Sequence, residues 1–165
     1  MSTVQIRALA TRVLAAARKR DLKIATAESC TGGLVAAALT EIAGSSDVVD
    51  RGFVTYSDEA KEAMLGVPSA TLKRYGAVSP ETAAAMATGA LKNSPADMSV
   101  AITGIAGPGG GSKEKPVGLV YFAGASRNGR VIVVNRRFGK IGRGRVRQRS
   151  VVQALQLLQQ LAKRN

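Results

Sequence analysis

Residues 26–33 read Thr-Ala-Glu-Ser-Cys-Thr-Gly-Gly, a run of small side chains around one serine and one cysteine. This run follows a short apolar stretch and opens a helix-like pattern, so Ser29 is expected at the start of a helix, beside free backbone N–H groups. A serine in that position suits attack on a carbonyl carbon or binding of an anion. The chain contains no histidine, so a nucleophilic Ser29 needs a different base.

The residue types that are missing exclude several kinds of site. Without histidine, a Ser-His-Asp triad, a Cys-His pair and the usual histidine-containing zinc site are impossible. Cys30 is the single cysteine, which excludes an intramolecular disulfide and a CxxC ligand pair, and its alternative role is that of a small buried apolar residue. Asp47 and Asp58 have no compelling partner, which disfavours a carboxylate-only hydrolase. Ser-Lys, Ser-Tyr-Lys and purely electrostatic mechanisms remain.

Composition places these residues in an ordinary globular chain. The sequence has 165 residues with 45% hydrophobic content, enough for one domain with a sizeable core. No apolar stretch approaches membrane-spanning length and the N-terminus lacks a signal-peptide layout, so we expect a cytoplasmic protein without membrane contact. Trp is absent and only three Tyr and three Phe occur, which argues against aromatic stacking on single-stranded nucleic acid.

Positive charge is concentrated in the last third of the chain. The formal net charge is +13, and no acidic residue follows Glu114. The cluster between 136 and 149 consists of Arg136, Arg137, Lys140, Arg143, Arg145, Arg147 and Arg149. It suits phosphate groups, although a solvated helix face is the alternative. One or two arginines in a pocket are favoured over a DNA-binding surface, so nucleic acid is not the expected partner.

The elements that position these residues alternate between helical and strand patterns. Helices are predicted over 3–19, 31–43, 58–65, 68–75, 80–92 and 143–163, with Gly44 closing the second. Strands are predicted over 23–27, 48–57, 98–103, 118–125 and 130–138, with an Asn128-Gly129 hairpin turn. Helices interleaved with strands, plus one hairpin, predict a single-domain three-layer α/β/α sandwich with a mixed sheet over residues 1–165.

Three segments together resemble one family, the C-terminal domain of CinA, whose characterised members are nicotinamide-nucleotide amidases. They are residues 26–33, then Gly-Phe-Val-Thr-Tyr-Ser at 52–57 with Lys61 following, and Thr-Gly-Ile-Ala-Gly-Pro-Gly-Gly at 103–110 leading to Lys-Pro-Val-Gly at 115–118. The resemblance spans nearly the whole chain. Longer family members carry a nucleotide-pyrophosphatase-like domain before this one, so the chain looks like the stand-alone form, and family precedent makes a homo-oligomer the expectation.

The resemblance implies hydrolysis of the carboxamide of nicotinamide mononucleotide, without a metal or a cofactor. Ser29 matches the nucleophile of the family, and Lys61 and Tyr56 match its proton-transfer pair. The residues after Ser29 would surround the substrate, and the N–H groups of Cys30 or Thr31 would stabilise the oxyanion. The rest of the predicted substrate-binding turn is Gly32 and Gly33.

Each catalytic assignment has a plainer alternative. Ser29 would otherwise be a helix N-cap, and Tyr56 a sheet residue with its hydroxyl at the surface. An ammonium cannot accept a proton, so a basic Lys61 must be buried or near other cations, whereas the alternative is an exposed helix lysine paired with Glu59 or Glu62.

The remaining predicted contacts concern the ribose phosphate. Thr103, Gly104 and Gly107 belong to a glycine-rich stretch that offers backbone donors, although it lacks the Gly-Lys-Ser/Thr ending of a Walker loop. Arg143 matches an arginine of the family's Gly-Asp-Arg segment and is the predicted phosphate ligand. Here the preceding positions are Ile141 and Gly142 instead.

This departure leaves Arg145 or Arg147 as possible substitutes for Arg143. It also motivates a second hypothesis, a nucleotide-binding module without turnover. The basic last third and the naming of the family after competence and DNA damage motivate a third, a nucleic-acid-associated protein. Glu28, next to Ser29, is assigned a structural or orienting role, because a carboxylate near Lys61 would oppose its action as a base.

Overall fold

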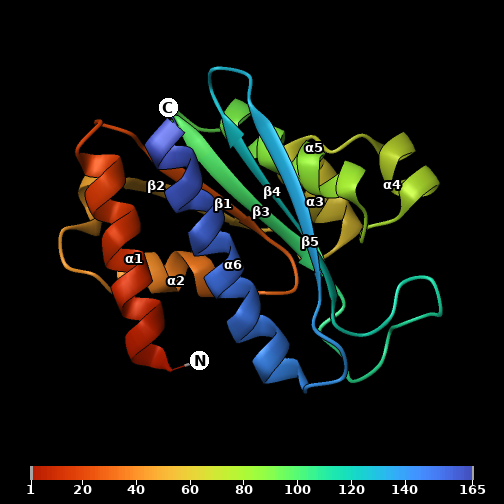
Figure 1. The fold of residues 1–165 in the computed structure, drawn as a ribbon. Helices are drawn as coiled ribbons and strands as arrows, with labels where there is room; N and C mark the ends of the chain where they lie inside the picture. Colours follow the sequence, from red (N-terminus) through yellow and green to blue (C-terminus); the bar gives the residue numbers. More distant parts are fainter. Residues whose placement is uncertain (1, 165) are drawn as a thin grey trace.

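A computed structural model describes residues 2–164, and its centre is a five-stranded sheet of order β2-β1-β3-β4-β5 (Figure 1). The strands are β1 (Ile24–Glu28), β2 (Val49–Val54), β3 (Met98–Gly104), β4 (Leu119–Ser126) and β5 (Val131–Arg137). β1 pairs in parallel with β2 and β3, whereas β4 pairs antiparallel with β3 and β5. The predicted mixed sheet is confirmed.

Helices cover both faces of this sheet (Figure 1). One face carries α1 (Thr3–Arg18), α2 (Leu34–Thr40) and α6 (Arg143–Arg164). The other carries α5 (Pro80–Lys92), against which α3 (Asp58–Leu65) and α4 (Ser69–Tyr75) pack. A short 3₁₀ turn, η1 (Ser45–Asp47), precedes β2. These helices and the sheet form the predicted three-layer α/β/α arrangement.

The two cores differ in the size of their side chains. The core under α1 and α6 contains large residues such as Phe122, Met98 and Leu155, all fully buried. The core under α5 is built mainly from alanine, so this helix can approach the sheet closely. Gly89 of α5 likewise leaves no room for a Cβ beside the backbone carbonyl of Leu65, which brings α3 against α5. This close packing fixes α3, the helix that carries Lys61.

The helices α3 and α5 each follow a serine whose side chain caps the first turn. Ser57 caps α3 by accepting a hydrogen bond from the N–H of Ala60 at 3.0 Å, and Gly66 ends the helix with a φ of 65°. Ser79 caps α5, with Pro80 as its first residue.

The boundaries of α2 differ from the prediction of a helix over 31–43. Gly32 and Gly33 have φ values of 57° and 96°, a left-handed conformation that a helix cannot contain, so α2 begins only at Leu34. It ends at Thr40, and Gly44 opens η1 instead of closing the helix. Ser29 therefore lies in an irregular turn between β1 and α2, not in the first turn of a helix.

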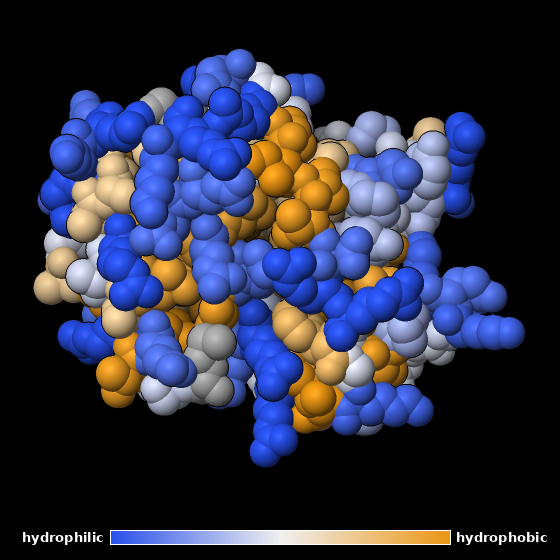
Figure 2. Space-filling model, viewed as in Figure 1, coloured by the Kyte–Doolittle hydropathy of each residue, from blue (hydrophilic) through white to orange (hydrophobic). Residues whose placement is uncertain are grey.

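The surface is mainly polar. Figure 2 shows hydrophilic side chains over much of the face formed by α1 and α6, with apolar residues visible in places between them. Within residues 2–164, no helix is both long and apolar enough to cross a membrane.

Candidate active site

The predicted site residues gather where the parallel strands end. Ser29 directly follows β1, Tyr56 follows β2, and Thr103 and Gly104 are the last residues of β3. Since these three strands are parallel neighbours, their carboxyl ends meet at one edge of the sheet. That edge is where open α/β sheets hold their ligands.

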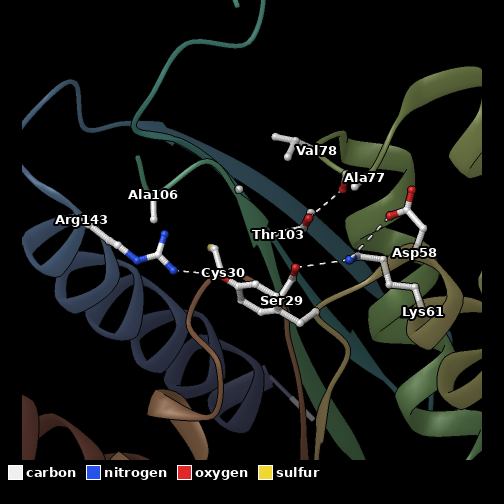
Figure 3. A pocket seen from close by; sticks show the side chains of 11 residues that line it. Ser29, Cys30, Asp58, Lys61, Ala77, Val78, Thr103, Ala106 and Arg143 are labelled. Carbon is white, nitrogen blue, oxygen red and sulfur yellow. Dashed lines mark hydrogen bonds and ion pairs between the residues drawn. The ribbon is translucent and has the colours of Figure 1, made fainter. Parts of the chain in front are cut away.

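A pocket of about 210 Å³ lies at this edge (Figure 3). Seven of its lining residues were predicted from the sequence: Ser29, Cys30, Tyr56, Lys61, Thr103, Gly104 and Arg143. Sequence reasoning missed Asp58, Ala77, Val78 and Ala106. Asp58 could have been found, because it lies three residues before Lys61 on the same helix and therefore on the same helix face.

Ser29 and Lys61 point toward each other across the pocket (Figure 3). The Lys61 ammonium lies 3.3 Å from the Ser29 Oγ, and it also donates to the backbone carbonyls of Thr55 at 3.1 Å and Ser57 at 3.4 Å. The lysine side chain is only 1% exposed. The alternative of a surface lysine paired with Glu59 or Glu62 is wrong.

Burial of Lys61 changes its acid–base behaviour. Desolvation lowers the pKa of the amine below its ordinary value, because the charged form loses contact with water. Asp58, whose Oδ1 lies 3.9 Å from the lysine Nζ, acts in the opposite direction, as do Cys30 and Glu59. Burial is the largest of these effects, so a larger neutral fraction is present at a given pH than in an exposed lysine. A neutral amine can accept the proton of the Ser29 hydroxyl.

The turn after Ser29 is held by groups other than the serine side chain. Glu28 is fully buried and accepts hydrogen bonds from the N–H groups of Val35 at 2.9 Å and Ala36 at 3.0 Å. It thereby caps α2 from a neighbouring strand, which confirms its structural role and leaves the Ser29 hydroxyl for Lys61. The alternative of Ser29 as a helix N-cap is wrong, because the N-cap position of α2 is occupied by Gly33.

Cys30 has the properties of a small buried residue. Its side chain is 5% exposed, and burial raises the pKa of the thiol to about 12. The thiolate is therefore scarce at neutral pH, which disfavours Cys30 as the nucleophile of this site. The backbone N–H groups of Cys30 and Thr31 donate no hydrogen bond to any other residue of the described chain. Of these two residues, Cys30 lines the pocket, whereas Thr31 is fully buried and does not, so it is the Cys30 N–H that lies at the pocket.

Arg143, the first residue of α6, closes the opposite side of the pocket. Its Nη2 donates to the hydroxyl of Tyr56 at 2.7 Å, and its Nη1 donates to the carbonyl of Gly107 at 3.1 Å. Tyr56 is 58% exposed, and within residues 2–164 its hydroxyl makes no hydrogen bond to Ser29 or Lys61, the other two residues of the predicted catalytic set. Arg145 is exposed and does not line the pocket.

Four of the predicted binding residues, Thr31, Gly32, Gly33 and Gly107, do not line the pocket. Thr31 is fully buried, and Gly32 and Gly33 shape the turn without lining the pocket. Gly107 also lies outside the lining, and reaches the site only through its bond with Arg143. Thr103 lines the pocket, but its hydroxyl donates to the carbonyl of Ala77 at 2.7 Å and so joins β3 to the segment before α5.

The arrangement supplies a serine hydroxyl, a buried amine, the backbone of Cys30 and one arginine around a single pocket. The part of the chain that the structure describes gathers no group of three acidic or cysteine side chains that could hold a metal ion. The family model of the CinA C-terminal domain matches residues 6–162, nearly the whole chain. The chain belongs to the CinA C-terminal domain family.

The relatives that this chain matches include proteins of about its own length and much longer proteins. A protein from Escherichia coli strain K12 named nicotinamide-nucleotide amidohydrolase PncC is 49% identical over 97% of this chain and 96% of its own length. A CinA-like protein from Akkermansia muciniphila is 60% identical over 67% of this chain but only 27% of its own length. The chain therefore spans about a quarter of the longer relatives that it matches.

Solved structures of the CinA family share this fold. The crystal structure of a competence/damage inducible protein, CihA, from Agrobacterium tumefaciens is 57% identical in sequence and covers 93% of both chains with a TM-score of 0.91.

Proposed function

We propose that this protein is a nicotinamide-nucleotide amidase that converts nicotinamide mononucleotide to nicotinate mononucleotide and ammonia without a metal. The observation that carries the proposal is the 3.3 Å contact between the Lys61 amine and the Ser29 hydroxyl inside a pocket. The relatives named nicotinamide-nucleotide amidohydrolase, matched over 84% and 96% of their own lengths, support the choice of substrate.

The first half of the reaction forms an ester on Ser29. Neutral Lys61 accepts the hydroxyl proton as the Ser29 Oγ attacks the carboxamide carbon, and the carbonyl oxygen becomes an oxyanion. The N–H of Cys30, which lines the pocket, stabilises that charge. The C–N bond then breaks, and the lysine returns its proton to the leaving nitrogen, which departs as ammonia.

The second half consumes one water molecule. Lys61, neutral again, accepts a proton from water as the water oxygen attacks the ester carbon, and the same backbone donor stabilises the second oxyanion. The C–O bond to Ser29 breaks, the serine regains its proton from Lys61, and the carboxylic acid leaves. One buried lysine thus acts as base and acid in turn, as histidine does in a serine triad.

Arg143 is proposed to bind the phosphate, as the only arginine side chain that lines the pocket within the described residues. Tyr56 then acts on Arg143, because its hydroxyl accepts the 2.7 Å hydrogen bond that orients the guanidinium. This role replaces the proton relay expected from the sequence, since the described residues provide no hydrogen bond from Tyr56 to Ser29 or Lys61.

The test is release of ammonia and of nicotinate mononucleotide from nicotinamide mononucleotide, with and without a chelator. We expect turnover that the chelator leaves unchanged, with kcat lowered by about 10³-fold or more in Ser29→Ala and in Lys61→Met. Arg145→Met is the matched control, since this exposed arginine is on α6 but off the pocket. Nucleotide binding without turnover at any pH would favour the competing hypothesis of a binding module.

A further inference from the structure

Asp58 brings a negative charge to a pocket whose other charged side chains are basic. Within residues 2–164, the charged residues of the lining are Asp58, Lys61 and Arg143. Figure 3 shows Arg143 on one side of Ser29 and Asp58 on the other side, beyond Lys61. The pocket therefore has a basic group at one end and an acidic group at the opposite end.

The carboxylate of Asp58 is little used by the rest of the protein. It accepts no hydrogen bond from the described residues, and its one ion pair with them is the 3.9 Å contact with the Lys61 Nζ. That contact favours the charged amine and so opposes the action of Lys61 as a base. The Asp58 side chain is 53% exposed, so a ligand in the pocket can reach it.

The proposed substrate has a complementary distribution of charge. In nicotinamide mononucleotide the ring nitrogen carries the ribose, so the ring is a pyridinium cation, and the phosphate at the other end of the molecule is an anion. A nucleotide with its carboxamide at Ser29 and its phosphate at Arg143 has its cationic ring toward the Asp58 end of the pocket. The carboxylate then attracts the ring, whereas a protonated Lys61 would repel it.

We propose that Asp58 is a specificity residue that selects nucleotides with a cationic pyridinium ring over their reduced, dihydropyridine forms. The inference rests on the proposed amidase function, which supplies the substrate. Reduction makes the ring neutral and leaves its size nearly the same, so the two forms differ mainly in their attraction to a charge. Specificity is the difference between the two affinities, and Asp58 contributes to the affinity for the cation alone.

A purely structural role for Asp58 makes a different prediction. A negative charge in the first turn of α3 stabilises the helix through its dipole, and Glu59 supplies a second charge in the same turn. Loss of a structural charge would weaken the binding of both forms of the nucleotide or of neither. Loss of a contact with the cation would weaken the binding of the oxidised form only.

The test measures the dissociation constants of nicotinamide mononucleotide and of its dihydro form by isothermal titration calorimetry. Every protein carries Ser29→Ala, so the nucleotide is not consumed, and the pH lies on the alkaline plateau of the rate profile, where Lys61 is neutral. We expect Asp58→Asn to raise the Kd of the oxidised nucleotide about fivefold and to leave that of the dihydro form within about twofold. Asp58→Glu keeps the charge and should retain most of the preference.

Glu59→Gln is the matched control, because it removes a charge from the same turn of α3 but lies outside the pocket lining. Equal weakening of both nucleotides in Asp58→Asn, or no change in either, would overturn the inference. An equal loss of preference in Glu59→Gln would also overturn it, by assigning the effect to the overall charge of the helix. Ammonia release by the wild-type chain is measured separately, so failure of the proposed function is distinguishable from failure of this inference.

Discussion

Replacing Asp58 with asparagine should increase activity on the acid side of the pH profile. The carboxylate lies 3.9 Å from the Lys61 Nζ and raises the pKa of the lysine against the larger lowering caused by burial. Asparagine removes this stabilisation of the ammonium, so the pKa of Lys61 falls further. Because only the neutral amine accepts the Ser29 proton, the acid limb should move to lower pH.

The size of the effect follows from the distance and the exposure. Asp58 is 53% exposed, so water screens its charge. The dielectric constant of water therefore gives a lower value for the interaction energy between its carboxylate and the Lys61 ammonium. Two unit charges 3.9 Å apart then interact by about 1 kcal/mol, which corresponds to a factor of about 5 in the ratio of neutral to charged lysine. On the acid limb, Asp58→Asn should exceed wild type about fivefold after each profile is divided by its own plateau.

The assay is kcat/KM for ammonia release as a function of pH, which reports the essential base of the free enzyme. Glu59→Gln is the matched control, because Glu59 lies in the same first turn of α3 and affects the Lys61 pKa less than Asp58 does. Normalisation to the plateau removes any change in substrate attraction that accompanies the loss of a charge at the pocket. An acid limb that stays in place in Asp58→Asn, or moves to higher pH, would refute the assignment of Lys61 as the base.

Three further substitutions test separate parts of the structure. Tyr56→Phe removes the acceptor for Arg143 and should raise KM about threefold to tenfold, equivalent to about 1 kcal/mol, in steady-state kinetics, with a smaller effect on kcat. Glu28→Gln leaves a buried N–H of α2 without a full acceptor, so we expect a loss of about 1–3 kcal/mol and a lower Tm in thermal denaturation; an unchanged Tm would contradict the cap. Gly89→Ala should lower the Tm despite the better helix propensity of alanine, because its Cβ would overlap a backbone carbonyl of α3, whereas the exposed Gly144→Ala, with open space around it, should be neutral or stabilising.

Much of the fold could be predicted because its signals are local. The caps at Ser57 and Ser79 and the apolar stripes of α1 and α6 are readable from short windows of sequence. The start of α2 could not be predicted in this way. The alanine-rich pattern predicts a helix through Gly32 and Gly33, whose left-handed backbone is a property of the folded turn. The cap that α2 does have comes from Glu28 in the preceding strand, a contact that depends on how the strand and the helix meet.

Some features of the candidate site could also be predicted from the sequence, and others could not. Ser29, Lys61 and Arg143 are assigned through the resemblance to the CinA family, and the structure brings all three to one pocket. The hydrogen-bond partner of Tyr56 could not be predicted, because Tyr56 and Arg143 are distant in sequence and meet only in the folded protein. The contacts of Arg147 with the carbonyls of Cys30 and Thr31 could not be predicted, because these residues are 117 and 116 positions apart from it in the sequence.

The central claim is that Ser29 forms an ester with the substrate, and peptide mass mapping after rapid acid quench during turnover tests it most directly. The account predicts that the peptide containing Ser29 carries the nicotinate mononucleotide acyl group, and that Ser29→Ala lacks it. Turnover with an unmodified Ser29 peptide, or an acyl group on a different residue, would contradict the account.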